Sequence, residues 1–211
     1  MTPLIFDIDG TLVQTSDFEG YYYIQAIKHV FGDVDITDNW GLYKNVTDVG
    51  ILKQIMEENK IQDKSIIPKI QKKFGEYIRN YLENGGRCDP IKGAVDFFKK
   101  YRLKKKYTLG IATGGWGHTA KLKLQYAGFD IQDIILTSCD DHDERVEIMK
   151  RCLNKLGGSN NNAIYFGDGD WDQNACQQLG WKFVGVGSNL MGKCDFWIQN
   201  FSDQGTIEKF L

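Results

Sequence analysis

Short apolar runs that stop at glycine-rich or acidic turns recur along the chain and predict the strands of a buried sheet. These runs cover Pro3–Ile8, Tyr107–Ala112, Asp133–Thr137, Asn162–Phe166 and Lys182–Val186. Helical periodicity separates the last four of them, over Gly117–Ala127, Glu144–Leu156 and Asp172–Leu179. Strands that alternate with helices in this way predict an α/β fold, in which helices cover both faces of a Rossmann-like parallel sheet.

The pattern changes between the first strand and the rest of the predicted sheet. Apolar residues there recur at helical spacing, as in Ile51, Leu52, Ile55 and Met56, and Thr47 stands where a helix N-cap is expected. A second helix is predicted over 70–82, ending before two consecutive glycines. We therefore expect an all-helical cap over residues 15–89, inserted into an α/β core made of residues 1–14 and 90–211.

Composition narrows the class of protein. The chain has 211 residues, of which 42% are hydrophobic and 26% charged, with a formal net charge of −2. A globular protein without a basic field is not expected to bind nucleic acid or a membrane surface. The five cysteines lie far apart without a CxxC pair, and no signal peptide is evident, so we expect reduced thiols and a cytoplasmic protein. The sequence does not specify an oligomeric state.

An acidic turn, Asp7-Ile8-Asp9-Gly10-Thr11, directly follows the first predicted strand. Ligand sites of open α/β sheets form beyond the carboxyl ends of the strands, and alternation would point Asp7 and Asp9 to the same side. Two carboxylates so close repel unless a cation or a proton separates them. The pair therefore favours a metal and a division of roles, with one aspartate as nucleophile and the other as proton shuttle.

A second acidic turn follows the predicted strand that ends at Phe166. It reads Gly167-Asp168-Gly169-Asp170-Trp171-Asp172. Carboxylates that converge from two strands suit a hard cation such as Mg²⁺, which prefers oxygen ligands. A calcium loop of the EF-hand type would need glycine and glutamate where Gln173 and Leu179 stand, so that alternative fails.

Two further features complete the candidate site. Thr113 and Gly114 follow the predicted strand 107–112 and offer a hydroxyl and free N–H groups to phosphate oxygens. Trp116 and His118, which come shortly after them, are candidate substrate contacts. Arg145 opens the helix that follows the strand ending at Thr137. It is our candidate for the positive group that offsets the charge of nucleophile and phosphoryl group.

Together these motifs resemble the haloacid dehalogenase superfamily, in the subgroup with a helical cap that includes phosphoglycolate phosphatases and β-phosphoglucomutases. The first acidic turn is similar to that family's DxDGT motif, Thr113 to its second motif, and Gly167-Asp168 with Asp172 to its GDxxxD motif. The motifs occur in family order, and the likeness covers essentially the whole chain. The third motif differs, because many relatives carry Lys-Pro where this chain has Arg145-Val146.

The resemblance implies a Mg²⁺-dependent phosphatase that hydrolyses a small phosphorylated metabolite through an aspartyl-phosphate. It implies Asp7 as nucleophile and Asp9 as general acid and base. It implies that Asp7, the Asp9 carbonyl and Asp168 hold the metal, with Asp172 as ligand or support. A phosphomutase, a phosphonatase with a cap lysine and a non-catalytic phosphate-binding module stay open as alternatives. A metal-free dehalogenase is disfavoured, because such relatives lack an acid at the Asp9 position.

Overall fold

The computed structural model describes residues 1–158 and 162–211 and contains one sheet of six parallel strands. The strand order is β3-β2-β1-β4-β5-β6, so β1 lies between β2 and β4. The strands are β1 (Thr2–Phe6), β2 (Tyr107–Ala112), β3 (Ile135–Thr137), β4 (Ile164–Gly167), β5 (Lys182–Val186) and β6 (Trp197–Ile198). This arrangement confirms the predicted α/β fold.

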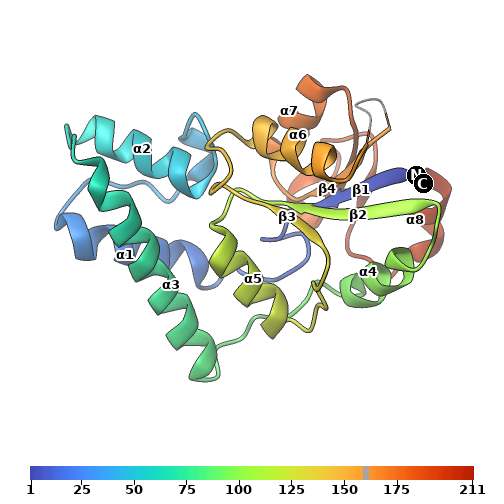
Figure 1. Ribbon diagram of the computed structural model, residues 1–211, viewed down its shortest axis with the longest axis horizontal. Coiled ribbons are helices and arrows are strands. Elements are labelled where there is room, and N and C mark those ends of the chain that lie inside the picture. Colours follow the sequence, from blue (N-terminus) through green and yellow to red (C-terminus); the bar gives the residue numbers. More distant parts are fainter. Residues whose placement is uncertain (159–161) are drawn as a thin grey trace.

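Helices cover both faces of the sheet, as Figure 1 shows. The core helices are α4 (Ala94–Arg102), α5 (Gly117–Tyr126), α6 (Arg145–Lys155), α7 (Asp170–Leu179) and α8 (Gln204–Phe210). Helices α6 and α7 lie on one face, and α4 and α5 lie on the other (Figure 1). All five predicted strands are present, whereas α4, β6 and α8 were not predicted. Strand β6 has two residues, so pairing with β5 defines it better than any local pattern does.

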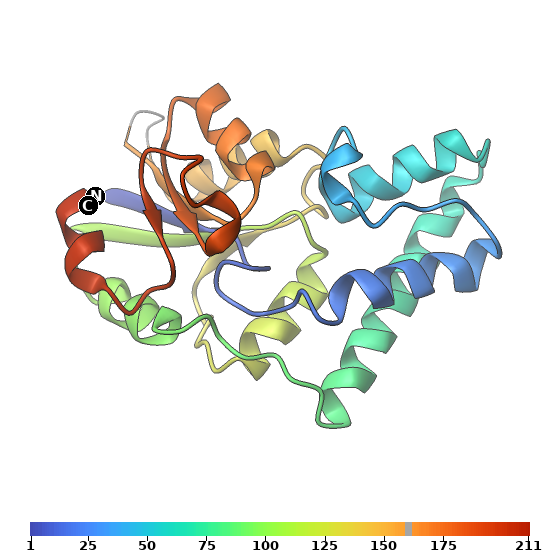
Figure 2. The same cartoon turned by 180° about the vertical axis from the view of Figure 1, so that it is seen from behind.

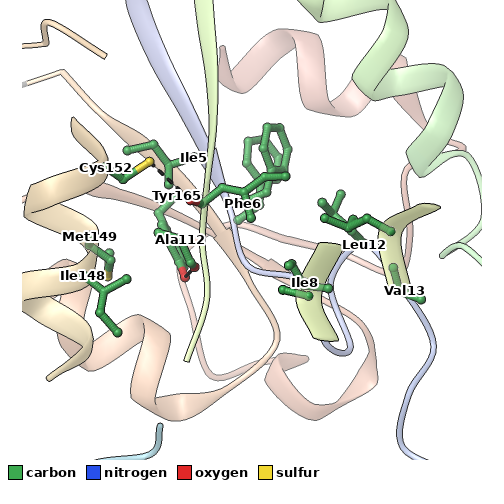
Figure 3. Close-up of a cluster of buried hydrophobic side chains, with 14 of the residues drawn as sticks. Ile5, Phe6, Ile8, Leu12, Val13, Ala112, Ile148, Met149, Cys152 and Tyr165 are labelled. Atoms are coloured by element: carbon green, nitrogen blue, oxygen red, sulfur yellow. Dashed lines mark hydrogen bonds between the residues drawn. The ribbon is translucent and has the colours of Figure 1, made fainter. Parts of the chain in front are cut away.

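Alternation along β1 supplies both faces of the core. The ring of Phe6 stacks on that of Phe166 with centroids 4.7 Å apart and also meets Phe97 and Phe98 of α4. On the other face, Figure 3 shows Ile5 beside Cys152 of α6. All five of these side chains and Ile5 itself are buried. The central residues of a strand buried on both faces must be apolar, so the first charged residue of this segment, Asp7, stands directly after the end of β1.

The segment between β1 and α4 forms a separate group of helices at the end of the sheet where the strands finish (Figures 1 and 2). It contains α1 (Glu19–Phe31), α2 (Asp48–Glu58) and α3 (Ile67–Glu83), with short 3₁₀ turns at Trp40–Leu42 and Lys64–Ile66; a third such turn, Ser188–Leu190, belongs to the core. Thr47 caps α2 as predicted, because its side chain accepts a hydrogen bond from the Gly50 N–H at 3.0 Å.

The two ends of this helical segment lie side by side. The Gln14 N–H donates to the Asp89 carbonyl at 2.8 Å, and the Ile91 N–H donates to the Leu12 carbonyl at 2.8 Å. The helices α1 to α3 fall within the expected cap range of 15–89, and these bounds stay a prediction.

The five cysteines are free thiols, and four of them are buried. Among the described residues, no helix combines the length and apolar character required to cross a lipid bilayer.

Candidate active site

The carboxyl ends of three neighbouring strands bring the predicted motifs together. Asp7, Thr113 and Asp168 directly follow β1, β2 and β4, and β1 lies between the other two strands. The Asp7 N–H donates to the Phe166 carbonyl at 2.9 Å, which continues the β1–β4 pairing by one residue. Strand order therefore brings residues more than 150 positions apart in the chain to one edge of the sheet.

The turn after β1 is shaped so that Asp168 can approach it. Gly10 has a φ of +75°, and a Cβ at this position would lie 2.0 Å from Asp168 Oδ2. A side chain here would therefore collide with the carboxylate and would also strain the backbone. The absence of a side chain at Gly10 therefore leaves the space that the Asp168 carboxylate occupies.

Arg145 lies at the start of α6 and reaches into the same edge of the sheet. Its Nη1 lies 2.9 Å from Asp172 Oδ1 and 3.5 Å from Asp7 Oδ1, and its Nη2 donates to the Val46 carbonyl at 2.9 Å. The side chain is 11% exposed. Its Nε finds no hydrogen-bond partner among the described residues, which leaves one N–H in the site. Sequence position alone suggested this residue, and the structure brings its charge next to Asp7.

The carboxylates of Asp7, Asp168 and Asp172 form a compact cluster, with one oxygen of each within 4.8 Å of the others. Burial and the neighbouring Asp172 raise the pKa of Asp7 to about 7, although Arg145 opposes this shift. Burial, followed by Asp172 and Asp7, also raises the pKa of Asp168. Such mutual repulsion in a desolvated site is relieved by a cation, and three carboxylate oxygens match the preference of Mg²⁺.

Asp9 has a different environment, which sequence analysis missed. Its Oδ1 lies 2.5 Å from Lys123 Nζ on α5, and the same ammonium group pairs with Glu19 of α1. The Lys123 side chain is fully buried. Burial favours the neutral form of Asp9, but Lys123 and hydrogen bonds hold its pKa below the usual 3.8. A signal existed in the sequence, because Lys123 shares a helical stripe with Ala120, Leu124 and Ala127.

The cap meets the core at the turn after β2. The Asp48 N–H donates to the Gly114 carbonyl at 2.8 Å, and Asp48 Oδ2 accepts from the Trp116 N–H at 2.9 Å. The Thr113 hydroxyl accepts from the Gly115 N–H at 3.2 Å. Sequence analysis did not identify Asp48, because it lies at the N-terminus of a cap helix without a motif around it.

Cap and core enclose a cavity of about 350 Å³. Its core side includes Asp7, Asp9, Thr113, Gly114, Arg145 and Asp168, and its cap side includes Glu19, Tyr23, Trp40, Val46, Asp48 and Ile51. This volume is near the lower end of the roughly 300–1,000 Å³ that is usual for ligand pockets. The cavity therefore has room for a small metabolite.

Three of the predicted site residues do not line this cavity as the structure describes it. Trp116 is 1% exposed and packs its ring against Tyr23 and Phe74. His118 is exposed and its ring lies against Gly75 of α3. A Cβ added at Gly75 would lie 2.2 Å from Nε2 of His118. Asp172 is fully buried beneath Arg145. Trp116 still contributes its backbone N–H to Asp48, whereas its ring supports the cap–core contact.

Comparisons with known proteins are consistent with this arrangement. The model of the family described as haloacid dehalogenase-like hydrolase matches residues 4–186. Among solved structures, a hydrolase from Pseudomonas syringae has 21% identity and a TM-score of 0.68, with 99% of this chain and 90% of that chain covered. CbbY from Rhodobacter sphaeroides, in complex with phosphate, has 15% identity and a TM-score of 0.74, with 97% of both chains covered.

A third structure, β-phosphoglucomutase from Clostridium difficile, has 18% identity and a TM-score of 0.74, with 100% of this chain and 98% of that chain covered. At these identities the structural matches show a shared fold. No curated protein sequence matched the chain.

Replacing Gly10 with alanine tests the close approach of Asp168. We expect Gly10→Ala to lose about 1–2 kcal/mol of unfolding free energy from its positive φ and a further 1–3 kcal/mol, roughly, from the collision. The control is Gly128→Ala, which has a φ of +83° and no atom within 4 Å of the added Cβ. Denaturant unfolding measures both. Equal losses for the two variants would contradict the predicted collision.

Replacing Lys123 tests the buried ion pairs. Lys123→Met leaves two carboxylates without their cation, so we expect it to lower the free energy of unfolding by about 3–5 kcal/mol. The control is Lys121→Met, which changes an exposed lysine of the same helix and should cost less than about 0.5 kcal/mol. Urea unfolding followed by circular dichroism gives both values. A loss below about 1 kcal/mol in Lys123→Met would refute the expected contribution.

Proposed function

Because the chain belongs to the haloacid dehalogenase-like hydrolases, we propose that it is a Mg²⁺-dependent phosphatase acting on a small phosphorylated metabolite. The observation that carries this proposal is the placement of Asp7. Asp7 is 4% exposed and lines the cavity, and its carboxylate lies beside both Arg145 and the other two carboxylates of the cluster. A buried carboxylate with a neighbouring cation and access to a cavity is suited to nucleophilic attack.

The donor set fits Mg²⁺. Asp7 and Asp168 would hold the ion together with the main-chain carbonyl of Asp9, and Asp172 would act as a further ligand or orient Arg145. Burial and the repulsion between neighbouring carboxylates raise the pKa of Asp7 and Asp168, which supports a cation between them. When bound, the ion would offset the negative charge of the nucleophile and of the phosphoryl group.

The first step forms a bond between an Asp7 carboxylate oxygen and phosphorus, while the bond from phosphorus to the ester oxygen breaks. The leaving oxygen takes a proton from Asp9, and the product on the enzyme is an aspartyl-phosphate. Because Lys123 keeps the pKa of Asp9 low, Asp9 first accepts this proton from the monoanionic phosphate ester and then passes it to the leaving oxygen. Arg145 and the Thr113 turn would stabilise the charge on the phosphoryl oxygens.

The second step is hydrolysis of the aspartyl-phosphate. Ionised Asp9 accepts a proton from water, the water oxygen attacks phosphorus, and inorganic phosphate leaves as the Asp7 carboxylate is regenerated. The Lys123 ion pair supports this step, because it holds Asp9 in its ionised form until a proton arrives.

The alternatives differ in what they require. A phosphonatase would need a cap lysine at the reacting carbon, but in the described part of the chain no lysine lines the cavity. Lys53, one of the cap lysines, instead pairs with Asp143 at 2.6 Å. A phosphomutase would use the same aspartates and return the phosphoryl group to the substrate. Release of inorganic phosphate therefore indicates a phosphatase, because a phosphomutase does not release it.

Replacing the proposed nucleophile tests the function directly. We expect the wild-type protein to release phosphate from p-nitrophenyl phosphate with Mg²⁺ and to stop when EDTA is added. Asp7→Asn should lower kcat/KM by about 10³-fold or more, because the amide cannot form the acyl-phosphate. Asp170→Asn, an exposed carboxylate at the start of α7, is the matched control and should keep its activity. Unchanged turnover in Asp7→Asn would rule out this nucleophile.

The raised pKa of Asp7 predicts how pH affects stabilisation by the metal. The pKa of Asp7 is about 7 in the fold against 3.8 ordinarily, so the metal-free protein loses stability as pH rises through this interval. Mg²⁺ favours the ionised carboxylate. The increase in Tm caused by Mg²⁺ should therefore be larger at about pH 8 than at about pH 5.5. Thermal unfolding measures it, and an increase independent of pH would contradict the assignment.

A further inference from the structure

The cap side of the cavity indicates which kind of phosphorylated metabolite fits. We propose that the leaving group carries hydroxyl groups and no second anionic group, as in a phosphorylated polyol or sugar. This inference rests on the proposed phosphatase function and specifies its substrate class.

The cap wall offers hydrogen-bond acceptors and aromatic rings. Glu19 and Asp48 contribute carboxylates, and Tyr23 and Trp40 contribute rings that meet edge to face with centroids 5.9 Å apart. Carboxylate oxygens accept hydrogen bonds from hydroxyl groups, and ring faces suit the C–H surface of a polyol. Gly20 allows this arrangement, because a Cβ there would lie 3.1 Å from the Trp40 ring.

One hydrogen bond from the core and one from the cap hold Asp48 in place. Its Oδ2 accepts from the Trp116 N–H at 2.9 Å, and its carbonyl accepts from the Tyr23 hydroxyl at 2.5 Å. The acceptor therefore does not depend on a mobile surface side chain. A fixed acceptor can distinguish a hydroxyl group from a carboxylate in the same place.

The positive charges near the cavity are already engaged. Arg145 is the only cationic side chain that lines it in the described part of the chain, and its Nη atoms contact Asp172, Asp7 and the Val46 carbonyl. Lys123 lies behind the wall, fully buried, and pairs with both Asp9 and Glu19.

A second phosphate or a carboxylate on the leaving group would therefore meet Asp48 without a compensating cation. Burying an unpaired charge beside a like charge is strongly unfavourable. A hydroxyl group in the same place can instead donate a hydrogen bond to a carboxylate of the cap wall. The charge pattern of the cap thus selects against anionic leaving groups, while the core binds the phosphoryl group that reacts.

The test compares substrates that differ in one group. Glycerol 3-phosphate and 3-phosphoglycerate share a three-carbon skeleton and differ by a hydroxymethyl against a carboxylate. Fructose 6-phosphate and fructose 1,6-bisphosphate differ by one phosphate. We expect kcat/KM to be at least about tenfold higher for the hydroxyl-bearing member of each pair. The assays are run with Mg²⁺ at about pH 8, where Asp48, whose pKa burial raises to about 7, is ionised.

Asp48→Asn assigns the preference to the cap wall. The amide keeps the size and an acceptor for the Trp116 N–H but removes the charge, so the ratio of kcat/KM within each pair should fall several-fold. Asp38→Asn is the control, because it removes the same charge from an exposed position of the cap and should leave the ratio unchanged.

The outcomes separate the two proposals. Equal or faster turnover of the anionic member by the wild-type protein would overturn the substrate class and leave the phosphatase intact. An unchanged ratio in Asp48→Asn would overturn the role of Asp48. If neither these esters nor p-nitrophenyl phosphate releases phosphate, the proposed function is wrong and the substrate class falls with it.

Discussion

Four aspartate side chains share one end of the sheet, and the buried cations Arg145 and Lys123 offset their repulsion. Removing charges from water costs several kcal/mol per ion, roughly, so such a cluster persists only with well-placed partners. Arg145 forms ion pairs with Asp7 and Asp172, and Lys123 forms an ion pair with Asp9. The two aspartates of the first motif thus have separate cations. Burial and Asp172 outweigh Arg145 and raise the pKa of Asp7, whereas Lys123 and hydrogen bonds outweigh burial and lower the pKa of Asp9.

The same two cations also bind residues of the cap. Arg145 donates to the Val46 carbonyl in the loop before α2, and Lys123 pairs with Glu19 on α1. Asp48 adds hydrogen bonds to the turn after β2. The contacts between cap and core therefore involve groups that also neutralise or surround the carboxylates of the candidate site. Movement of the cap would change the environment of Asp9 as well as access to the cavity, because Glu19 competes with Asp9 for one ammonium group.

Much of the fold followed from periodicity. Strands β2 and β5 span the predicted residues, and Thr47 caps its helix as its residue type indicated. A buried strand with a turn after it has a strong local pattern, because both faces must be apolar. Strand β6 and helix α8 were missed for the opposite reason. Their short segments gain order mainly by pairing and packing against elements distant in sequence.

Local sequence patterns were sufficient to identify the polar groups of the candidate site: paired aspartates after one strand, a second acidic turn, and a threonine-glycine turn in a parallel α/β framework. Strand order then follows from the fold and brings Asp7, Thr113 and Asp168 to one edge. The folded structure was needed to show that Lys123 pairs with Asp9 and Glu19, and that Asp48 rather than Trp116 or His118 lines the cavity. The physical reason is that a strand or turn is encoded by neighbouring residues, whereas a buried ion pair or a cavity wall depends on how distant helices pack.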